Sequence, residues 1–594
     1  MLSPDAREVA TDILRPPAGY RLDCTVMTTY SLDLEVLLAL PLAVLAQADG
    51  GVEELLEDPL LLLEALREAS GRVHVFVDEA GIALPSVQRQ LYAALEPSVH
   101  PVRAPGGGAF HPKVWVARFE SDEREPLLRV AVASRNLTFD RSWDVALVSE
   151  ASPGHEPQAA SEPLAHLVKH LPELGREALE PKLDTALDTI ADELSRTAFP
   201  APDGFRSPIA FHALGLEGQE SGFWQPVAGA RRLLAVAPFL GQGALQSLAE
   251  QVAGDLRLVS RAEALDGLPE QALEPWDEKH VLMEAALDEP GDDTAGRPSG
   301  LHAKLIAAEY RSRVHWFMGS ANLTPAAFRG QNVEVMAQLD APLKSGGSGI
   351  DAFWDGGFAN LCMAYQRHEA PKEDEAGKEA RRALEQQRDA LLNAGLIIQC
   401  APDGTNWEWR VEGAVPEVGG VTVEAWPVTL SSDQARPGEE AMAWSLPMER
   451  LTAFVAFRLR SEADVDDLAL VAKLPAEGLP EGREHRVLRT LIDSPERLLA
   501  FLRALLGGLE GLVDWAETGP REGEEQDRGV PLQAETLLED LLRVASRDPE
   551  RLETVRRLMA DLATEDASGE KVVPDDLYAI WQAIDAALPK EAES

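Results

Sequence analysis

The sequence lacks long apolar runs and is poor in cysteine. No stretch of about 18 apolar residues occurs, the length that a membrane-spanning helix needs. The most apolar early segment, residues 34–47, is interrupted by Glu35 and Pro41, so we expect a buried helix there. The N-terminal segment MLSPDAREVATDIL is acidic and polar, unlike a secretory signal. The three cysteines are scattered, which predicts a cytoplasmic protein with reduced thiols and no zinc site.

Positive charge is also scarce. The chain has 55 Lys and Arg residues against 100 Asp and Glu residues, a net charge of −45. A nucleic-acid-binding protein usually presents a basic face, and a chain this acidic is repelled by DNA and by anionic membranes. Two explanations stay open: an acidic bias shared by a whole proteome, or a basic partner subunit that delivers the substrate.

The length of 594 residues predicts two to four domains. Alternating strand-like and helix-like segments indicate two α/β units, followed by short alternating strands and then helical patterns. The tryptophans of the strand-rich part are at strand spacing, which is more typical of core residues than of a binding surface. The predicted divisions are two α/β halves at 1–160 and 161–370, a helical linker at 371–395, a β-rich module at 396–490 and a helical C-terminal domain at 491–594.

One polar pattern stands out in the second α/β unit. His302 and Lys304 are two residues apart in an apolar, strand-like segment. Ser320 and Asn322 close a second predicted strand, and Glu334 follows in a third. Because side chains two residues apart point to the same face of a strand, neighbouring strands would bring these groups together. Such a set supplies a nucleophile or acid together with donors for a phosphoryl oxyanion.

The first α/β unit contains the same pattern. His111 and Lys113 correspond to His302 and Lys304, and the separation of the histidines is 302 − 111 = 191 residues. The remaining members of the first copy are Ser134, Asn136 and Asp144. A single HxK motif has many chance matches, but two copies, each followed by SxNLT and an acidic residue, are a strong signal.

With these motifs, residues from about 15 to 370 resemble the phospholipase D superfamily. The resemblance implies an α/β fold in which two α/β/α halves form one pseudo-symmetric unit, here followed by a small β-rich module and a helical C-terminal domain. One departure is that the family's aspartate, five residues after each lysine, is replaced by Arg118 and Glu309. In this respect the chain is more similar to the nuclease-like prokaryotic branch than to the lipid-hydrolysing enzymes.

The resemblance also implies roles. One of His111 and His302 attacks phosphorus to form a phosphohistidine, and the other protonates the leaving oxygen. The carboxylates Asp144 and Glu334 orient the histidines. Lysines, asparagines and serines hold the phosphate oxygens: Lys113, Lys304, Asn136, Asn322, Ser134 and Ser320. These donors take the place of a metal, so we expect neither a metal nor another cofactor.

The favoured hypothesis is a nuclease for DNA or RNA, possibly part of a bacterial restriction or antiviral defence complex. A second is a phosphodiesterase or transferase for phospholipids, which the lack of a membrane anchor and of the motif aspartates disfavours. A third is a non-catalytic subunit that docks a helicase or methyltransferase partner through residues 396–594. Substrate class, base specificity and partner identity stay open at this stage.

Overall fold

The computed structural model describes residues 13–38, 40, 71–139, 141–217, 222–283, 299–343, 347–368, 375–438 and 441–480, with isolated residues from 482 onward. The predicted helical domain at 491–594 therefore lies outside the described residues, apart from single positions. Within the described ranges, no helix is long and apolar enough to cross a membrane.

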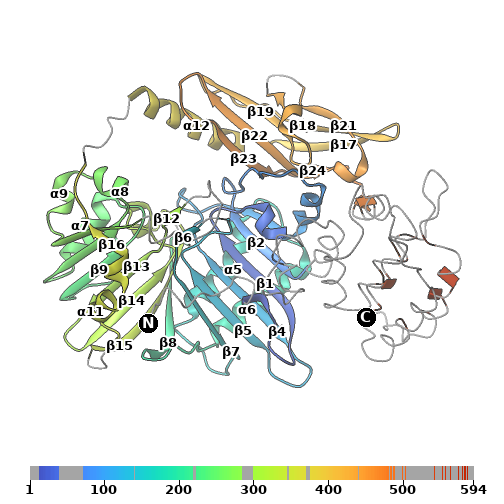
Figure 1. Ribbon diagram of the computed structural model, residues 1–594. Helices are drawn as coiled ribbons and strands as arrows, with labels where there is room; N and C mark the ends of the chain where they lie inside the picture. The colour runs from blue at the N-terminus through green and yellow to red at the C-terminus, as the bar shows by residue number, and fades with distance from the viewer. Residues whose placement is uncertain are drawn as a thin grey trace, which may run out of the picture.

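Two large sheets, which lie side by side in Figure 1, repeat one strand order. The first runs in space as β3 (Val99–Val102), β2 (Val73–Asp78), β1 (Arg21–Thr29), β4 (Val114–Glu120), β5 (Leu127–Ala133) and β7 (Ala146–Ala151). The second contains the same order in β11 (Glu278–Leu282), β10 (Leu256–Ser260), β9 (Arg232–Val236), β13 (Leu305–Glu309), β14 (Arg313–Gly319) and β15 (Glu334–Pro342). Two further strands flank it, β16 (Cys362–Ala364) and β8 (Arg206–Leu214).

Strand directions repeat as well. In each repeated set of six strands the first strand in sequence pairs in parallel with the second, β1 with β2 and β9 with β10. It pairs antiparallel with the strand that follows the HxK motif, β4 or β13. Strands such as β13 are buried along their whole length, which explains why they read as continuous apolar runs rather than alternating ones.

Two helices lie between the sheets. Helix α5 (Glu162–Leu174) and helix α6 (Pro181–Ser195) each carry proline at the first or second helical position, where its missing N–H costs nothing. Apolar residues recur on one face of α6, at Leu183, Leu187, Ile190 and Leu194. These faces belong to one buried cluster that includes Val26 of the first sheet and Leu305 of the second. The two halves therefore share a core.

The outer face of the second sheet is covered by short helices: α7 (Gln242–Glu250), α8 (Ala262–Asp266), α9 (Glu270–Leu273) and α10 (Pro325–Phe328). The outer face of the first sheet has a different cover, because its buried cluster extends into the β-rich module. Figure 1 shows that module above the two halves.

The β-rich module contains the predicted linker helix, α12 (Glu375–Asn393), and two four-stranded sheets. One consists of β21 (Ala443–Leu446), β18 (Asn406–Glu412), β17 (Ile397–Asp403) and β24 (Ala476–Glu477). The other consists of β20 (Arg436–Pro437), β19 (Val421–Pro427), β22 (Phe454–Ser461) and β23 (Leu468–Lys473). Trp409 and Trp426 are buried in the shared cluster, as predicted.

Polar contacts fix the module to the first half. Glu96, in the 3-10 helix Gln90–Ser98, accepts a hydrogen bond from the Ala453 amide at 2.8 Å and pairs with Arg483 at 3.0 Å. Lys473 donates to the carbonyls of Glu96 and Val99. A mixed α/β fold with several sheets is therefore confirmed, whereas the division into the five predicted domains stays a prediction.

Candidate active site

The two HxK motifs lie at the entry to a strand, not within one. β4 begins at Val114 and β13 begins at Leu305, so each histidine and lysine belongs to the loop just before its strand. The prediction that the motifs are strand residues on one face is wrong in this detail. Serine, asparagine and the acidic residue also gather at strand ends, because β14 ends at Gly319 and β15 begins at Glu334.

Short parallel pairings between the halves bring the two motifs together. Phe110, which precedes His111, forms a bridge with Val333, which precedes Glu334. In the other copy, strand β12 (Ser299–Leu301), which precedes His302, pairs in parallel with strand β6 (Arg141–Trp143), which precedes Asp144. The backbone N–H of His111 donates to the carbonyl of Val333 at 3.0 Å, and that of His302 donates to Trp143 at 3.0 Å. Each histidine is thereby placed beside the acidic residue of the opposite half.

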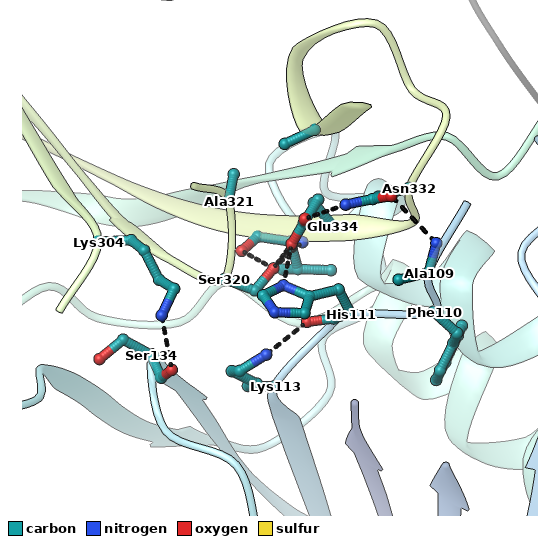
Figure 2. A network of polar contacts seen from close by, with 12 residues as sticks. Ala109, Phe110, His111, Lys113, Ser134, Lys304, Ser320, Ala321, Asn332 and Glu334 are labelled. Carbon is teal, nitrogen blue, oxygen red and sulfur yellow. Dashed lines mark hydrogen bonds and ion pairs between the residues drawn. The ribbon is translucent and has the colours of Figure 1, made fainter. Parts of the chain in front are cut away.

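The side chains form two crossed histidine–carboxylate pairs. His111 Nδ1 is 2.8 Å from Glu334 Oε2 (Figure 2). His302 Nδ1 is 3.0 Å from Asp144 Oδ1. An ionised carboxylate only accepts hydrogen bonds, so Nδ1 carries the proton in both rings and Nε2 is unprotonated while the ring is neutral. Neither Nε2 makes a hydrogen bond with the described part of the chain.

The two serines contact the carboxylates. Ser134 Oγ donates to Asp144 Oδ1 at 2.7 Å, and Ser320 Oγ donates to Glu334 Oε2 at 2.5 Å. Each hydroxyl oxygen also accepts the amide N–H that follows the acidic residue, from Val145 or Val335. A hydroxyl can donate one hydrogen bond, and in each pair the carboxylate accepts it. The geometry thus gives Ser134 and Ser320 a different partner from the phosphate oxygens that we predicted.

Both lysines are buried, and each donates to the carbonyl of its own histidine. Lys113 Nζ is 3.0 Å from His111 O, and Lys304 Nζ is 2.6 Å from His302 O. Lys304 Nζ also approaches Ser134 O, from the first half, at 3.5 Å (Figure 2). Each side chain therefore extends back past its histidine toward the junction of the halves, where two cations lie in one small volume.

Burial and neighbouring charge govern the ionisation of the site. Burial lowers the pKa of His111 to about 4, even though the negative charge of Glu334 acts in the opposite direction. Burial lowers the pKa of His302 as well. The pKa of Lys113 is well below its ordinary value, first because of burial and then because of the charge of Lys304.

The carboxylates stay ionised. Burial acts to raise the pKa of Glu334, but His111 and Lys113 outweigh it and the pKa is lowered. For Asp144, burial is likewise outweighed by the hydrogen bond from His302, and its pKa is lowered. Both pairs therefore consist of a neutral imidazole and a carboxylate near neutral pH.

The asparagines lie beside the histidines with hydrogen-bonding capacity to spare. Asn136 accepts a long hydrogen bond from the Ser31 amide at 3.4 Å, and its own N–H groups have no partner among the described residues. The side-chain oxygen of Asn322 is buried and has no hydrogen-bond partner there. Both amides have unused hydrogen-bonding groups, and their contact with phosphate oxygens stays a prediction.

Three residues that we did not predict complete the site. Asn332 donates to Glu334 Oε1 at 3.2 Å and accepts from the Ala109 amide at 3.0 Å (Figure 2). Asp78 accepts from the Phe110 amide at 2.8 Å. The Tyr30 ring lies 5.3 Å from the His111 ring. No sequence signal marks Asn332, because the other copy has Ser142 two residues before its carboxylate.

The glycine loop Gly106–Gly108, which precedes His111, has a packing role. A Cβ on Gly106 would lie 2.6 Å from Gln331 O, and one on Gly108 would lie 2.5 Å from Asn332 Oδ1. The loop therefore approaches residues 331–332 too closely for a side chain at these two positions. This contact holds Asn332 in place beside Glu334.

The residues at the two motif-aspartate positions make ion pairs outside the two crossed pairs. Arg118 binds Glu193 of α6 at 2.9 Å, together with Asp23 and Glu120. Glu309 is buried, pairs with Arg232 at 3.2 Å and accepts the Ile350 amide at 2.7 Å. Both serve as structural ion-pair residues.

In chemical terms the site combines two imidazoles with unprotonated Nε2 atoms, two buried ammonium groups and two side-chain amides. An uncharged Nε2 is a nucleophile or a proton acceptor, and ammonium and amide groups stabilise a developing oxyanion. Within the described residues, no group of three or more His, Cys, Asp or Glu side chains has the geometry to hold a metal ion.

No family model matches the chain, and no curated protein matches it in sequence. Among solved structures, yeast tyrosyl-DNA phosphodiesterase 1 is similar at 10% identity and a TM-score of 0.33, over 55% of this chain and 84% of that one. Polyphosphate kinase from Porphyromonas gingivalis is similar at 11% identity and a TM-score of 0.30, over 64% of this chain and 50% of that one. Likeness at these scores does not identify the reaction.

Proposed function

We propose that the chain is a phosphodiesterase that cleaves nucleic acid through its two histidines. The observation that carries this proposal is the crossed arrangement of His111–Glu334 and His302–Asp144 around two buried lysines. Each histidine has Nδ1 held by a carboxylate and Nε2 without a partner among the described residues, which is the state that nucleophilic and general acid–base catalysis need.

The reaction proceeds in two displacements. In the first, Nε2 of one histidine bonds to phosphorus, the P–O bond to the leaving group breaks, and the other histidine donates its Nε2 proton to that oxygen. In the second, water bonds to phosphorus, the P–N bond breaks, and the second histidine takes the proton from water. The carboxylate on Nδ1 stabilises the positive charge that its imidazole carries at each stage.

An asymmetry between the pairs favours His111 as the nucleophile. Glu334 has both oxygens bonded, Oε1 by Asn332 and Oε2 by His111 and Ser320, whereas Asp144 Oδ2 is buried without a partner among the described residues. His111 is also the histidine whose pKa is lowered to about 4, so it is neutral and ready to attack. We assign the proton transfers to His302, whose protonated form a bound phosphate anion favours.

The lysines and asparagines complete the proposed phosphate site. Lys113 and Lys304 would balance the charge of the non-bridging oxygens, and Asn136 and Asn322 would donate to them. In a chain of net charge −45, these two buried lysines would lie next to the substrate phosphate, whose negative charge favours their protonated forms. Because these donors supply the charge stabilisation, we expect activity to persist in EDTA.

The test is cleavage of single-stranded DNA, duplex DNA, RNA and a phospholipid in EDTA, with His111→Ala and His302→Ala beside the wild type. Cleavage of a nucleic acid that both substitutions abolish supports the proposal. Cleavage of the phospholipid alone would assign the site to lipids. A folded protein with no turnover on any of these substrates would favour a docking subunit, which a pull-down for a helicase or methyltransferase would then address.

A further inference from the structure

An exposed aromatic side chain lies next to the second motif. Phe239 follows the end of β9 and is 51% exposed, whereas the sheet residues before it are buried. The next residue, Leu240, forms a bridge with Leu323, which follows Asn322 in the motif. The Gly241 amide donates to Leu323 O at 2.7 Å. Phe239 is thus held at the rim of the site by the loop that carries Asn322.

An arginine covers this ring and is fixed to the motif. The guanidinium carbon of Arg261 lies 5.3 Å from the centre of the Phe239 ring. Arg261 Nε donates to Leu301 O at 2.8 Å, and Leu301 immediately precedes His302. Since Phe239 and Arg261 follow the neighbouring parallel strands β9 and β10, the pair lies on the same edge of the sheet as His302.

A second arginine–phenylalanine pair lies nearby, and its ring is partly buried against the core of the second sheet. The guanidinium carbon of Arg329 lies 4.4 Å from the centre of the Phe223 ring. Phe223 is near residue 243, because a Cβ on Gly243 would lie 3.2 Å from its ring and 3.6 Å from Pro325. The two arginine–phenylalanine pairs therefore flank one short stretch, residues 239–243, next to the NLT loop.

The position of the first half that corresponds to Phe239 does not hold an aromatic residue. Trp115 pairs with Met27, and Ile306, which is 191 residues later, pairs with Ala235. Met27 therefore corresponds to Ala235, and the residue that corresponds to Phe239, four positions further on, is Ser31. A phosphodiester has two arms, and the arm on the second half meets the two arginine–phenylalanine pairs, whereas the first half places Tyr30 beside His111 and an exposed Phe139 after its NLT stretch.

We propose that Phe239–Arg261 and Phe223–Arg329 form a stacking surface for unpaired bases of a single-stranded nucleic acid on one side of the scissile phosphate. This inference rests on the proposed function and specifies its substrate. Rings and guanidinium planes bind the faces of bases without regard to sequence, and a duplex keeps those faces stacked on each other. An acyl chain would gain nothing from the guanidinium groups, whereas a base with its phosphate does.

The experiment measures binding in the His111→Ala background, so that cleavage does not interfere. The probes are a fluorescent 12-residue oligothymidylate and an abasic strand of the same length. Phe239→Leu keeps apolar volume without a ring, and Phe239→Trp keeps a ring. Met363→Ala removes an exposed apolar side chain from the edge strand β16 and serves as the control. Thermal melting confirms that each variant is folded.

We expect Phe239→Leu to weaken oligothymidylate binding about tenfold, the size of one stacked base, and to leave abasic-strand binding unchanged. Phe239→Trp and Met363→Ala should bind as the parent does. Equal affinity of Phe239→Leu and the parent for oligothymidylate, or equal loss on both strands, would overturn the inference. Binding to phosphatidylglycerol vesicles that depends on Phe239, without oligonucleotide binding, would overturn it in favour of a lipid.

Wild-type cleavage is measured separately and keeps the two proposals distinct. Base-dependent binding without cleavage would support the stacking surface and reject the phosphodiesterase. Cleavage in EDTA with base-independent binding would support the phosphodiesterase and reject the stacking surface. Phe223→Leu should weaken binding of the 12-residue strand but not of a dinucleotide, and equal loss on both would contradict a surface for successive bases.

Discussion

His111 Nδ1 lies 2.8 Å from Glu334 Oε2, although the two residues are 223 positions apart and belong to opposite halves. The bridge between Phe110 and Val333 causes this pairing, since it places the histidine loop of one half alongside the start of β15 in the other. His302 and Asp144 repeat the relationship at 3.0 Å. Neither half contains a complete site, so the shared core between the sheets is a requirement of the proposed chemistry.

The crossed pairing predicts the effect of Glu334→Gln. The amide has nearly the shape of the carboxylate but no charge, so Nδ1 loses an ionised acceptor and the tautomer of His111 is no longer fixed. We expect kcat to fall by about a hundredfold or more, within the range of a general acid–base contribution. The measurement is steady-state cleavage of whichever nucleic acid the wild type accepts.

Glu309→Gln is the matched control, because Glu309 is also a buried glutamate but pairs with Arg232 outside the two crossed pairs. It should lower the melting temperature and leave kcat intact. A Glu334→Gln variant with the kcat of Glu309→Gln would show that the carboxylate beside His111 has no catalytic consequence.

Asp144→Asn should affect the other histidine. It weakens His302 as the proton acceptor from water, so the second displacement slows. With a p-nitrophenyl phosphodiester, whose leaving group needs no proton, the first displacement remains fast and a covalent adduct should accumulate on His111. Because the P–N bond of a phosphohistidine hydrolyses in acid, the protein is quenched in alkaline denaturant before peptide mass spectrometry. An adduct on His302 would reverse the assignment of the two roles, and Glu334→Gln, which impairs the nucleophile, should accumulate no adduct.

The sequence alone pointed to the candidate site residues because each is part of a pattern that occurs twice, with the two histidines 191 residues apart. Spacing predicted that the strands after His302 and before Ser320 are neighbours, and β13 does pair with β14, but the contacts of Ser320 are with the Glu334 that binds His111. It misplaced the motifs within strands, since a period-two pattern looks the same at a strand and at its entry. The hydroxyl partners of Ser134 and Ser320 could not be foreseen, because they depend on where the following backbone turns.

The crossed pairs also could not be predicted, because they arise from bridges between the halves at Phe110–Val333 and Leu301–Trp143 that no local pattern encodes. Asn332 was missed for a related reason, since it has no counterpart in the first copy. The β-rich module was predicted as a separate unit from its strand pattern. Its core nevertheless continues into that of the first sheet, a contact that depends on tertiary packing alone.

The glycine loop provides a test of Asn332. In Gly108→Ala the new methyl group would lie 2.5 Å from Asn332 Oδ1 and 2.7 Å from Gln331 O, so Asn332 must move and Glu334 loses a donor. We expect about tenfold lower kcat and a loss of roughly 1–3 kcal/mol in the free energy of unfolding, as for a buried hydrogen-bonding group left unpaired.

Gly107→Ala is the neighbouring control. Gly107 has a positive φ of 71° but nothing within 4 Å of an added Cβ, so alanine there costs backbone strain of about 1 kcal/mol and displaces no neighbour. Chemical denaturation and steady-state kinetics measure both variants. If Gly107→Ala lowers kcat as much as Gly108→Ala, the rate effect comes from the loop backbone and not from Asn332.

Replacing Arg118 should lower the stability of the protein without affecting catalysis. Its guanidinium joins β4 to Glu193 of α6, and both side chains are largely buried. Arg118→Ala would leave Glu193 buried and unpaired, which costs about 3 kcal/mol of unfolding free energy. The site is not contacted, so kcat should be unchanged once the protein is folded. Substitution by aspartate should destabilise at least as strongly and should not raise kcat.

The low pKa of His111 predicts that acid destabilises the protein. The unfolded chain binds a proton at His111 near its ordinary pKa of about 6.5, whereas the folded protein does so only near a pKa of about 4. Between these values the unfolded state holds more protons, so the contribution of His111 is complete above pH 6.5 and is lost as the pH falls toward 4. The loss is on the order of 3 kcal/mol.

We would measure unfolding by urea at intervals from pH 7 to 4 for the wild type, His111→Gln and His155→Gln. The control position, His155, is exposed. The pH slope should be smaller in His111→Gln and unchanged in His155→Gln. Identical slopes for the wild type and His111→Gln would mean that His111 takes up its proton in the folded protein as readily as in water, which is incompatible with the buried, carboxylate-bound imidazole described above.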